Sequence, residues 1–266
     1  MRVTSFGSGS NGNAFLVQSG ATALLIDAGV PIRLLRAGLK QAGVSDGQLS
    51  AVLLSHEHID HVRSVPQLLK YQPVPFAATG GTIEALRTAN ASWTRISAAT
   101  ALIVGDMAVT PISVSHDAAE PVGFVLQAGD VRAAIFTDLG ESNGDVRSAL
   151  GEATIIVLES NYDERLLRSG PYPAHLKRRI RGPLGHLGND ACGELLACQI
   201  RSHTTEIWLA HLSETNNRPD LARASTEAWI KVCGAAPNVR TVPRLGASIV
   251  WDSNETQRRA TQASLF

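Results

Sequence analysis

The sequence predicts an α/β fold of four layers (αββα), in which two β-sheets pack face to face and helices cover their outer sides. Two observations support this prediction. Short apolar, β-branched segments of strand length occur in two runs along the chain, and amphipathic helix patterns are interleaved with them. The chain has 266 residues, of which 44% are hydrophobic, so it can form a sizeable core within one large domain.

The first half begins with the pattern of a β-hairpin. Residues 13–18 and 23–26 are apolar, compact segments separated by a short turn, which is typical of two buried strands. Residues 32–42 place leucines at helical spacing and predict an amphipathic helix. A strand is expected over residues 49–54 and a helix over residues 62–69.

The second half continues this alternation. Strands are expected over residues 108–114, 131–136, 154–158, 207–210 and 241–251, and helices over residues 189–202 and 218–232. Asn189 and Asp190 are expected to cap the first of these helices. From Ser253 on, the composition becomes polar and charged. We therefore expect a folded domain over residues 1–252 and a flexible tail over residues 253–266.

Composition argues against several classes of protein. Lys plus Arg and Asp plus Glu each number 24, so no global positive charge marks a nucleic-acid-binding protein, although a local patch can still bind one. No stretch approaches the roughly 20 apolar residues that cross a bilayer, and the first residues lack the apolar run of a signal peptide. Cys192, Cys198 and Cys233 are odd in number and lack C-x-x-C spacing. They argue against a disulfide framework and predict a cytoplasmic protein.

The strongest chemical signal lies directly after the predicted strand 49–54. Four ligand-type residues, His56, His58, Asp60 and His61, stand within six positions. Imidazole nitrogen suits zinc and other late divalent ions, and a carboxylate adds negative charge. Two such ions about 3.5–4 Å apart can activate a water molecule for hydrolysis. The alternative is a solvated loop, or a histidine cluster with a single structural ion.

Three more ligand-type residues follow later predicted strands. His116, Asp138 and His211 each come directly after an apolar run, at the sheet edge where His56 is expected to emerge. A single histidine at a strand end is more often a surface residue than a ligand. Together, however, the three residues supply the further ligands that a second metal ion needs, so the sequence predicts a two-metal site.

With these residues, the chain resembles the metallo-β-lactamase superfamily, whose H-x-H-x-D-H motif matches residues 56–61. The resemblance implies the four-layer fold of that family and two divalent metal ions, manganese or zinc, with iron also compatible. It assigns His56, His58 and His116 to one ion, Asp60, His61 and His211 to the other, and Asp138 to a bridging position. Asp27 matches an early aspartate that supports the ligands, and a turn residue before Gly29 is the alternative.

Two further residues point to phosphodiester chemistry. In phosphodiesterase members of the superfamily such as ribonuclease Z, a histidine before the penultimate helix acts as general acid and is oriented by a glutamate. His186 and Glu159 match these positions. Hydrolysis of a phosphodiester requires protonation of the departing oxygen. We therefore expect Asp60, His186 and Glu159 among the catalytic residues, and a helix-capping role is the alternative for His186.

Over residues 1–252 the chain is similar to the YycJ/WalJ-like exonuclease subgroup of this superfamily. The matching segments are Phe6–Asn13, Ser115–Ala118, Thr137–Gly140, Gly185–Leu187 and His211–Asn217. The resemblance implies a DNA exonuclease that acts from 5′ ends in repair or replication, often with manganese. Two alternatives remain: a small-molecule hydrolase, either a cyclic phosphodiesterase or a glyoxalase-type thioesterase, and a non-catalytic module that binds metal or DNA.

Two surface features bear on partners. A basic cluster precedes His186 and could hold DNA phosphates, although a solvated helix face explains it equally well. Its members are Arg165, Arg168, Lys177, Arg178, Arg179 and Arg181. Tyr162 and Tyr172 lie in the same stretch and could stack on bases, although packing is the commoner use.

The last five residues resemble a known docking motif. Gln262–Phe266 is similar to the pentapeptide by which bacterial replication proteins bind the sliding clamp of DNA polymerase. Two apolar anchors on a flexible tether suit a hydrophobic groove, and the glutamine adds hydrogen bonds. A frayed terminus is the alternative.

Overall fold

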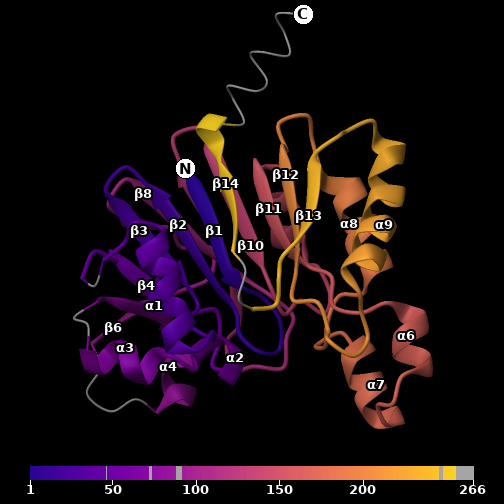
Figure 1. The fold of residues 1–266 in the computed structure, drawn as a ribbon, viewed down its shortest axis with the longest axis horizontal. Coiled ribbons are helices and arrows are strands. Elements are labelled where there is room, and N and C mark those ends of the chain that lie inside the picture. Colours follow the sequence, from indigo (N-terminus) through magenta and orange to yellow (C-terminus); the bar gives the residue numbers. More distant parts are fainter. Residues whose placement is uncertain (46, 72–73, 88–91, 246–247, 256–266) are drawn as a thin grey trace, which may run out of the picture.

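In the part of the chain that the structure describes, two β-sheets of seven strands each form the centre of the molecule, and helices lie on both outer sides (Figure 1). The computed structural model describes residues 1–255 except 46, 72–73, 88–91 and 246–247. The strand orders are β14-β1-β2-β3-β4-β5-β6 in the first sheet and β13-β12-β11-β10-β9-β8-β7 in the second. The predicted four-layer αββα arrangement is confirmed.

The first sheet consists of β1 (Arg2–Gly7), β2 (Ala14–Ser19), β3 (Thr22–Ile26), β4 (Ala51–Leu53), β5 (Phe76–Thr79), β6 (Trp93–Ile96) and β14 (Ile249–Asp252). The second consists of β7 (Leu102–Val104), β8 (Met107–Ser113), β9 (Val122–Ala128), β10 (Val131–Phe136), β11 (Ile155–Glu159), β12 (Glu206–Ala210) and β13 (Asn238–Thr241). The helices are α1 (Ile32–Gln41), α2 (Ile59–Val62), α3 (Val65–Tyr71), α4 (Gly80–Leu86), α5 (Gly144–Gly151), α6 (Glu164–Ser169), α7 (Ala174–Arg181), α8 (Asn189–Gln199) and α9 (Pro219–Ile230), followed by a 3₁₀ turn, Lys231–Cys233.

Three apolar layers hold the four structural layers together. The central layer lies between the sheets and contains Phe15 of the first sheet and Trp208 of the second, both fully buried. A second layer joins α1 and α3 to the first sheet around Leu35, and a third joins α5, α8 and α9 to the second sheet around Leu196. The burial of each such side chain contributes about 1.5–3 kcal/mol, so both sheets are fixed on both faces.

The expected strand 241–251 is wrong as one element: Thr241 ends β13, Ile249 begins β14, and the described residues between them form no strand. Two predicted helices also differ from the structure. The expected helix 62–69 is divided into α2 and α3, because Ser64 leaves the helix and donates hydrogen bonds to the carbonyl oxygens of Ala28 and Val30. The expected caps of α8 are wrong: Gly188 is the N-cap, and the Asn189 side chain points into the protein. Both differences arise from tertiary contacts that local patterns do not contain.

Nothing in the described part of the chain forms a helix that is both long and apolar enough to cross a membrane. All three cysteines are free thiols. Most of the expected tail, including Gln262–Phe266, lies outside the described residues.

Candidate metal centre

The carboxyl ends of six strands meet at one edge of the sandwich. Strands β3 and β4 are parallel, as are β10, β11 and β12, and β8 runs parallel to β10 because both are antiparallel to β9. The residues at or after these strand ends are Asp27 (β3), His56 (β4), His116 (β8), Asp138 (β10), Glu159 (β11) and His211 (β12). The fold therefore brings together every residue that sequence analysis placed at a strand end.

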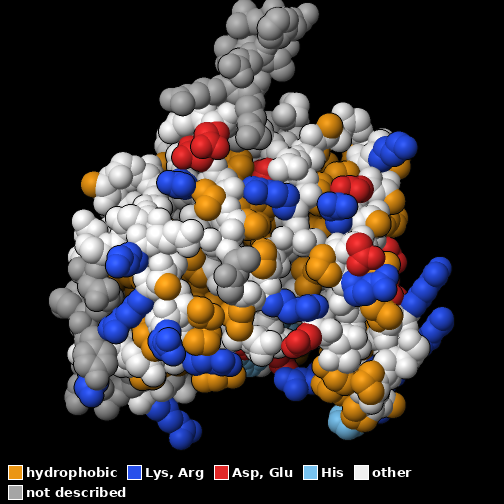
Figure 2. Space-filling model, viewed as in Figure 1, with side chains coloured by type: hydrophobic (Ala, Val, Ile, Leu, Met, Phe, Trp, Pro, Cys, Tyr) orange, Lys and Arg blue, Asp and Glu red, His pale blue; other side chains and the backbone are white. Residues whose placement is uncertain are grey.

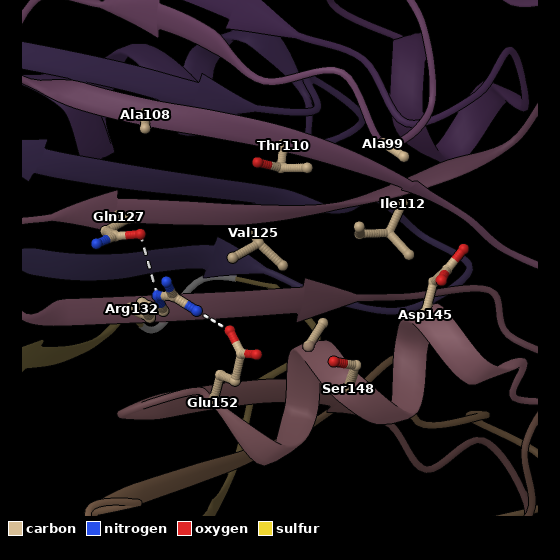
Figure 3. A pocket seen from close by; sticks show the side chains of 11 residues that line it. Ala99, Ala108, Thr110, Ile112, Val125, Gln127, Arg132, Asp145, Ser148 and Glu152 are labelled. Atoms are coloured by element: carbon tan, nitrogen blue, oxygen red, sulfur yellow. Dashed lines mark hydrogen bonds and ion pairs between the residues drawn. The ribbon is translucent and has the colours of Figure 1, made fainter.

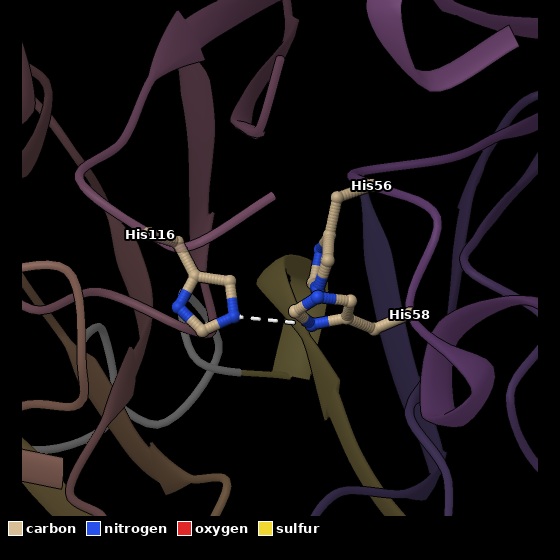
Figure 4. A group of neighbouring side chains, drawn as sticks. All are labelled: His56, His58 and His116. Atoms are coloured by element: carbon tan, nitrogen blue, oxygen red, sulfur yellow. Dashed lines mark hydrogen bonds between the residues drawn. The ribbon is translucent and has the colours of Figure 1, made fainter. Parts of the chain in front are cut away.

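Three imidazoles form one group, which we call the imidazole cluster: His56, His58 and His116. One nitrogen from each ring lies within 4.8 Å of the others. His116 Nε2 is 3.2 Å from His58 Nδ1, and Figure 4 shows the rings converging. The Ser55 hydroxyl contacts His56 Nδ1 at 3.0 Å, which directs Nε2 toward the cluster.

The electrostatics of this cluster favour a bound cation. Burial, reinforced by the neighbouring His61, lowers the pKa of His56 well below its usual value, and burial also lowers the pKa of His116. The lowered pKa values favour the neutral form of the His56 and His116 rings, which is the form that ligates metal. His56 Nε2 is buried and has no hydrogen-bond partner within the described residues. A buried nitrogen without a partner is costly unless an ion occupies its lone pair.

The second group, which we call the carboxylate-backed cluster, consists of Asp60, His61 and His211. Asp60 Oδ2 lies 3.7 Å from His61 Nε2 and 3.4 Å from His211 Nε2. Buried carboxylates behind the two histidines raise their pKa. Burial itself opposes this effect, but Asp27 and Asp138 raise the pKa of His61 to about 10. The pKa of His211 is likewise raised well above its usual value, chiefly by Asp138, against the effect of burial.

Asp138 lies between the two clusters. Its Oδ2 is 2.8 Å from His61 Nε2, and its Oδ1 is 3.7 Å from His116 Nε2. Burial disfavours the carboxylate, but His211 and His61 hold its pKa well below the usual range. Oδ2 is nevertheless buried without a well-directed hydrogen bond from any described residue. A buried anion between two groups of histidines has the donor set for divalent metal ions.

Asp27 supports the carboxylate-backed cluster from behind. Its Oδ2 lies 2.7 Å from His61 Nδ1, and its two oxygens accept hydrogen bonds from the Ser55 amide and hydroxyl. The backbone at Asp27 is left-handed (φ 59°). Gly29 allows the loop of residues 56–61 to lie against the backbone after β3, since a Cβ at Gly29 would lie 1.6 Å from the Asp60 carbonyl oxygen. Asp27 is thus a turn residue that also orients a ligand-type histidine.

Glu159 joins His186 to His211. Its Oε1 lies 2.9 Å from His186 Nδ1 and 2.7 Å from His211 Nδ1, while Oε2 accepts hydrogen bonds from the Leu139 and Leu187 amides. Burial lowers the pKa of His186, but the Glu159 carboxylate outweighs it and the net shift is upward. The His186 side chain is 23% exposed, so solvent reaches it although Glu159 and His211 are buried. The helix-capping alternative for His186 is wrong, because Gly188 is the N-cap.

Ser8, Asn13 and Asn161 support the ligand-type residues from behind, although the sequence alone gave them no role. The Ser8 hydroxyl donates to Asn13 Oδ1 at 2.7 Å and accepts the His211 amide at 2.9 Å. Asn13 Nδ2 lies 3.0 Å from His61 Nε2, and Asn161 Nδ2 donates to the His211 carbonyl oxygen at 2.8 Å. These contacts fix the left-handed backbone of His211 (φ 53°). The signal in the sequence was the Gly-rich segment 6–13.

The two tyrosines of the basic stretch are used for packing and hydrogen bonding in the structure. The Tyr162 ring lies over Gly188, where a Cβ would come within 2.9 Å of the ring. The Tyr172 hydroxyl donates to Thr215 Oγ1 at 3.3 Å.

A separate cavity of about 250 Å³ lies between α5 and the outer face of β8, β9 and β10 (Figure 3). Its wall is mixed polar and apolar, and Arg132 is paired there with Gln127 and Glu152. None of the ligand-type residues of the two clusters lines this cavity. The ligand-type residues therefore lie away from this cavity, at the strand ends.

Comparison with known proteins agrees with this geometry. A family model described as "Beta-lactamase superfamily domain" matches residues 22–199. The exodeoxyribonuclease YycJ of Bacillus anthracis is 34% identical over 232 residues, which cover 85% of this chain and 88% of that protein. The chain belongs to the metallo-β-lactamase superfamily. Within it, the chain belongs to the YycJ/WalJ group, since the exodeoxyribonuclease WalJ of Streptococcus pneumoniae is 31% identical over 222 residues, covering 81% of this chain and 82% of that protein.

Solved structures of the superfamily share the fold. The metallo-β-lactamase fold protein YhfI of Bacillus subtilis superposes with a TM-score of 0.70 at 19% identity, covering 94% of this chain and 98% of that chain. The short form of human tRNase Z superposes with a TM-score of 0.65 at 15% identity, covering 95% and 99%. The predicted family, the fold and the enzyme class, a metal-dependent hydrolase of phosphodiester bonds, are confirmed.

Proposed function

We propose that this enzyme is a two-metal exodeoxyribonuclease that digests DNA from 5′ ends in repair or replication. The observation that carries the proposal is the position of Glu159, which holds His186 beside the ligand-type residue His211. A proton donor at that place suits a phosphodiester, whose leaving oxygen must be protonated. The names of the YycJ and WalJ relatives support DNA as the substrate.

In this proposal, each cluster holds one divalent ion, manganese or zinc, and iron is compatible with the same ligands. The residues that would hold the ions are His56, His58 and His116 for one, Asp60, His61 and His211 for the other, and Asp138 between them. Bound ions supply Lewis acidity and positive charge for the attack on phosphorus.

Residues of the protein supply the proton for the leaving oxygen and fix the positions of the ligand-type side chains. Glu159 raises the pKa of His186, which favours the protonated ring, and fixes its orientation through Nδ1. Nε2 of His186 has no partner within the described residues and gives its proton to the departing oxygen. Asp27 and Ser55 hold the loop of residues 56–61 in place, which preorganises its ligand-type residues.

The test is a nuclease assay on duplex and single-stranded DNA, labelled at the 5′ or the 3′ end, with manganese, zinc or iron added. We expect mononucleotides to be released from the 5′ end, and a chelator to stop the reaction. RNA of the same sequence serves as the competing substrate, and Asp60→Ala serves as the inactive control. If Asp60→Ala and the wild type are equally inert on every phosphodiester offered, the proposal is wrong.

We also propose that residues 1–252 form the hydrolase domain and that Gln262–Phe266 docks on the sliding clamp of DNA polymerase. The proposed compartment is the cytoplasm, in line with three free thiols. Deletion of residues 262–266 should abolish binding to the purified clamp and leave the digestion of free DNA unchanged. Unchanged clamp affinity after the deletion would contradict the docking role.

A further inference from the structure

The segment between Glu159 and His186 differs in charge from the rest of the chain. It forms α6 and α7 and contains six Lys and Arg residues against two acidic ones, although the whole chain is balanced at 24 of each. The rest of the protein therefore carries a net negative charge. A positive segment on such a background concentrates the electrostatic attraction for an anionic polymer at one place.

This segment borders the metal centre. The chain leaves the centre at Glu159 and returns to it at His186, whose amide donates to the Ile180 carbonyl oxygen at 2.8 Å. Arg179 of α7 binds Asp117, the residue after His116, through Nε at 2.8 Å. In Figure 1, α6 and α7 lie below α8 and α9, at the same end of the molecule as α2, which carries Asp60.

Three of the six cations are already used within the protein. Arg179 is paired with Asp117, and Arg181 is paired with Glu164, with Nε 3.0 Å from Oε2. Lys177 Nζ donates to two carbonyl oxygens at the end of α6, at 2.8 and 2.7 Å. These contacts fix α7 against α6 and against the residue that follows His116.

The other three cations, Arg165, Arg168 and Arg178, point to solvent. All three are exposed, and none has an acidic partner in the part of the chain that the structure describes. Arg165 and Arg168 are three positions apart on α6 and share a face. Figure 2 shows Lys and Arg side chains projecting from the molecule near α6. Guanidinium groups without a protein partner are available for phosphates.

We propose that α6 and α7 form the surface that holds the DNA backbone next to the scissile phosphate. Arg165, Arg168 and Arg178 bind phosphates, whereas Lys177, Arg179 and Arg181 support the two helices. The inference rests on the proposed function, since it takes DNA as the substrate. It deepens that function by assigning the residues that hold long DNA, as distinct from those that cleave one bond.

The experiment compares the wild type with a triple variant, Arg165→Gln/Arg168→Gln/Arg178→Gln. A matched control, Arg33→Gln/Lys40→Gln/Lys231→Gln, removes three exposed cations from α1 and the 3₁₀ turn. Each enzyme is assayed on long duplex DNA over a range of salt concentrations, and on bis(p-nitrophenyl) phosphate, which has no phosphates beside the one that is cleaved.

For long DNA, we expect the KM of the triple variant to rise about tenfold or more, because three phosphate contacts are lost. The slope of log KM against log salt should fall by about 2 to 3. Its kcat, and its activity on the small phosphodiester, should equal those of the wild type. The control should match the wild type throughout.

The inference and the proposed function fail in different ways. If the wild type digests DNA and the triple variant shows the same KM and salt slope, the DNA surface is wrong and the exonuclease remains. If the KM shift appears on RNA and not on DNA, the assignment of the surface to DNA is wrong. If the wild type cleaves only the small phosphodiester, the proposed function fails, and the DNA surface fails with it.

Discussion

The two ligand clusters of the centre differ in what lies behind them. In the imidazole cluster, the rings face one another, and burial keeps the pKa of His56 and His116 low. In the carboxylate-backed cluster, Nδ1 of each histidine lies 2.7 Å from a buried carboxylate, and the pKa of both histidines is raised. A cation would therefore displace few protons from His56 and His116, whereas His61 and His211 would release protons when a cation binds.

The difference indicates that the two clusters have different roles in the proposed mechanism. Glu159 belongs to the carboxylate-backed side and is shared with His186, the proton donor of the proposed mechanism. No such carboxylate stands behind His56 or His58 among the described residues. The four predictions that follow test this division, beginning with the residue on which both clusters depend.

Asp138→Asn should have the largest effect. The variant keeps the size of the side chain and tolerates the left-handed backbone at this position (φ 55°), but it removes the negative charge between the clusters. Loss of a Lewis-acid interaction of several kcal/mol lowers kcat/KM by about 10³-fold or more. The measurement is kcat/KM on end-labelled DNA together with metal content. Asp145→Asn, on the exposed surface of α5, is the control, and activity within tenfold of wild type would contradict the central role of Asp138.

His186→Ala should rank second. The variant removes the proton donor and no member of either cluster, so kcat should fall by about 10²–10⁴-fold while metal content stays unchanged. His175→Ala, an exposed histidine on α7, should leave kcat unchanged. A glyoxalase-type thioesterase would hardly respond to the loss of His186, so a small effect on turnover would favour that alternative.

Asp27→Asn should weaken metal binding at the carboxylate-backed cluster and leave the imidazole cluster unchanged. Asp27 orients His61 and contacts no histidine of the imidazole cluster by a hydrogen bond. Outer-sphere partners of this kind change metal affinity by about 10–100-fold. In a chelator-competition titration, we expect the affinity for one of the two ions to fall by this factor and the affinity for the other to stay unchanged. Glu57→Gln, in the same loop but bonded to the Ala119 amide, is the control, and equal weakening of both ions by Asp27→Asn would contradict the division.

The smallest effect concerns the pH dependence of the metal-free protein. His61 has a folded pKa of about 10 against 6.5 when unperturbed, so its contribution to stability is fully present below pH 6.5 and is lost as pH rises through about 10. His56 has the opposite shift, and its contribution is lost as pH falls below 6.5. Urea unfolding in chelator should therefore show stability decreasing from pH 7 to pH 10. In Asp27→Asn that decrease should be smaller, and an unchanged decrease would contradict the role of Asp27.

Strand ends were the part of the site that sequence could predict. His116, Asp138 and His211 each follow an apolar run, and parallel strands necessarily deliver such residues to one edge. The same logic, with the family resemblance, placed Glu159 beside His186. The four-layer fold was predictable for a similar reason, because the periods of helix and strand are local properties of the sequence.

Roles that depend on distant contacts could not be predicted in this way. Ser8 and Asn13 look like ordinary residues of a Gly-rich turn, and only a contact across 203 positions gives Ser8 its role behind His211. Asn189 has the composition of a helix cap, yet its side chain pairs with Ser160 and Asn217 in the interior. In each case, a buried hydrogen-bond partner from elsewhere in the chain outweighed the local preference.

The closing strand has a consequence for synthesis of the enzyme. β14 pairs with β1, and the Ser253 amide donates to the Met1 carbonyl oxygen at 3.0 Å, so the first strand gains its outer neighbour only from the last part of the described chain. A nascent chain exposes its His56–His61 loop long before His211 and β14 leave the ribosome. The complete set of ligand-type residues therefore comes together only after β12 and His211 have been synthesised, so a shorter nascent chain carries the loop without its full set of partners.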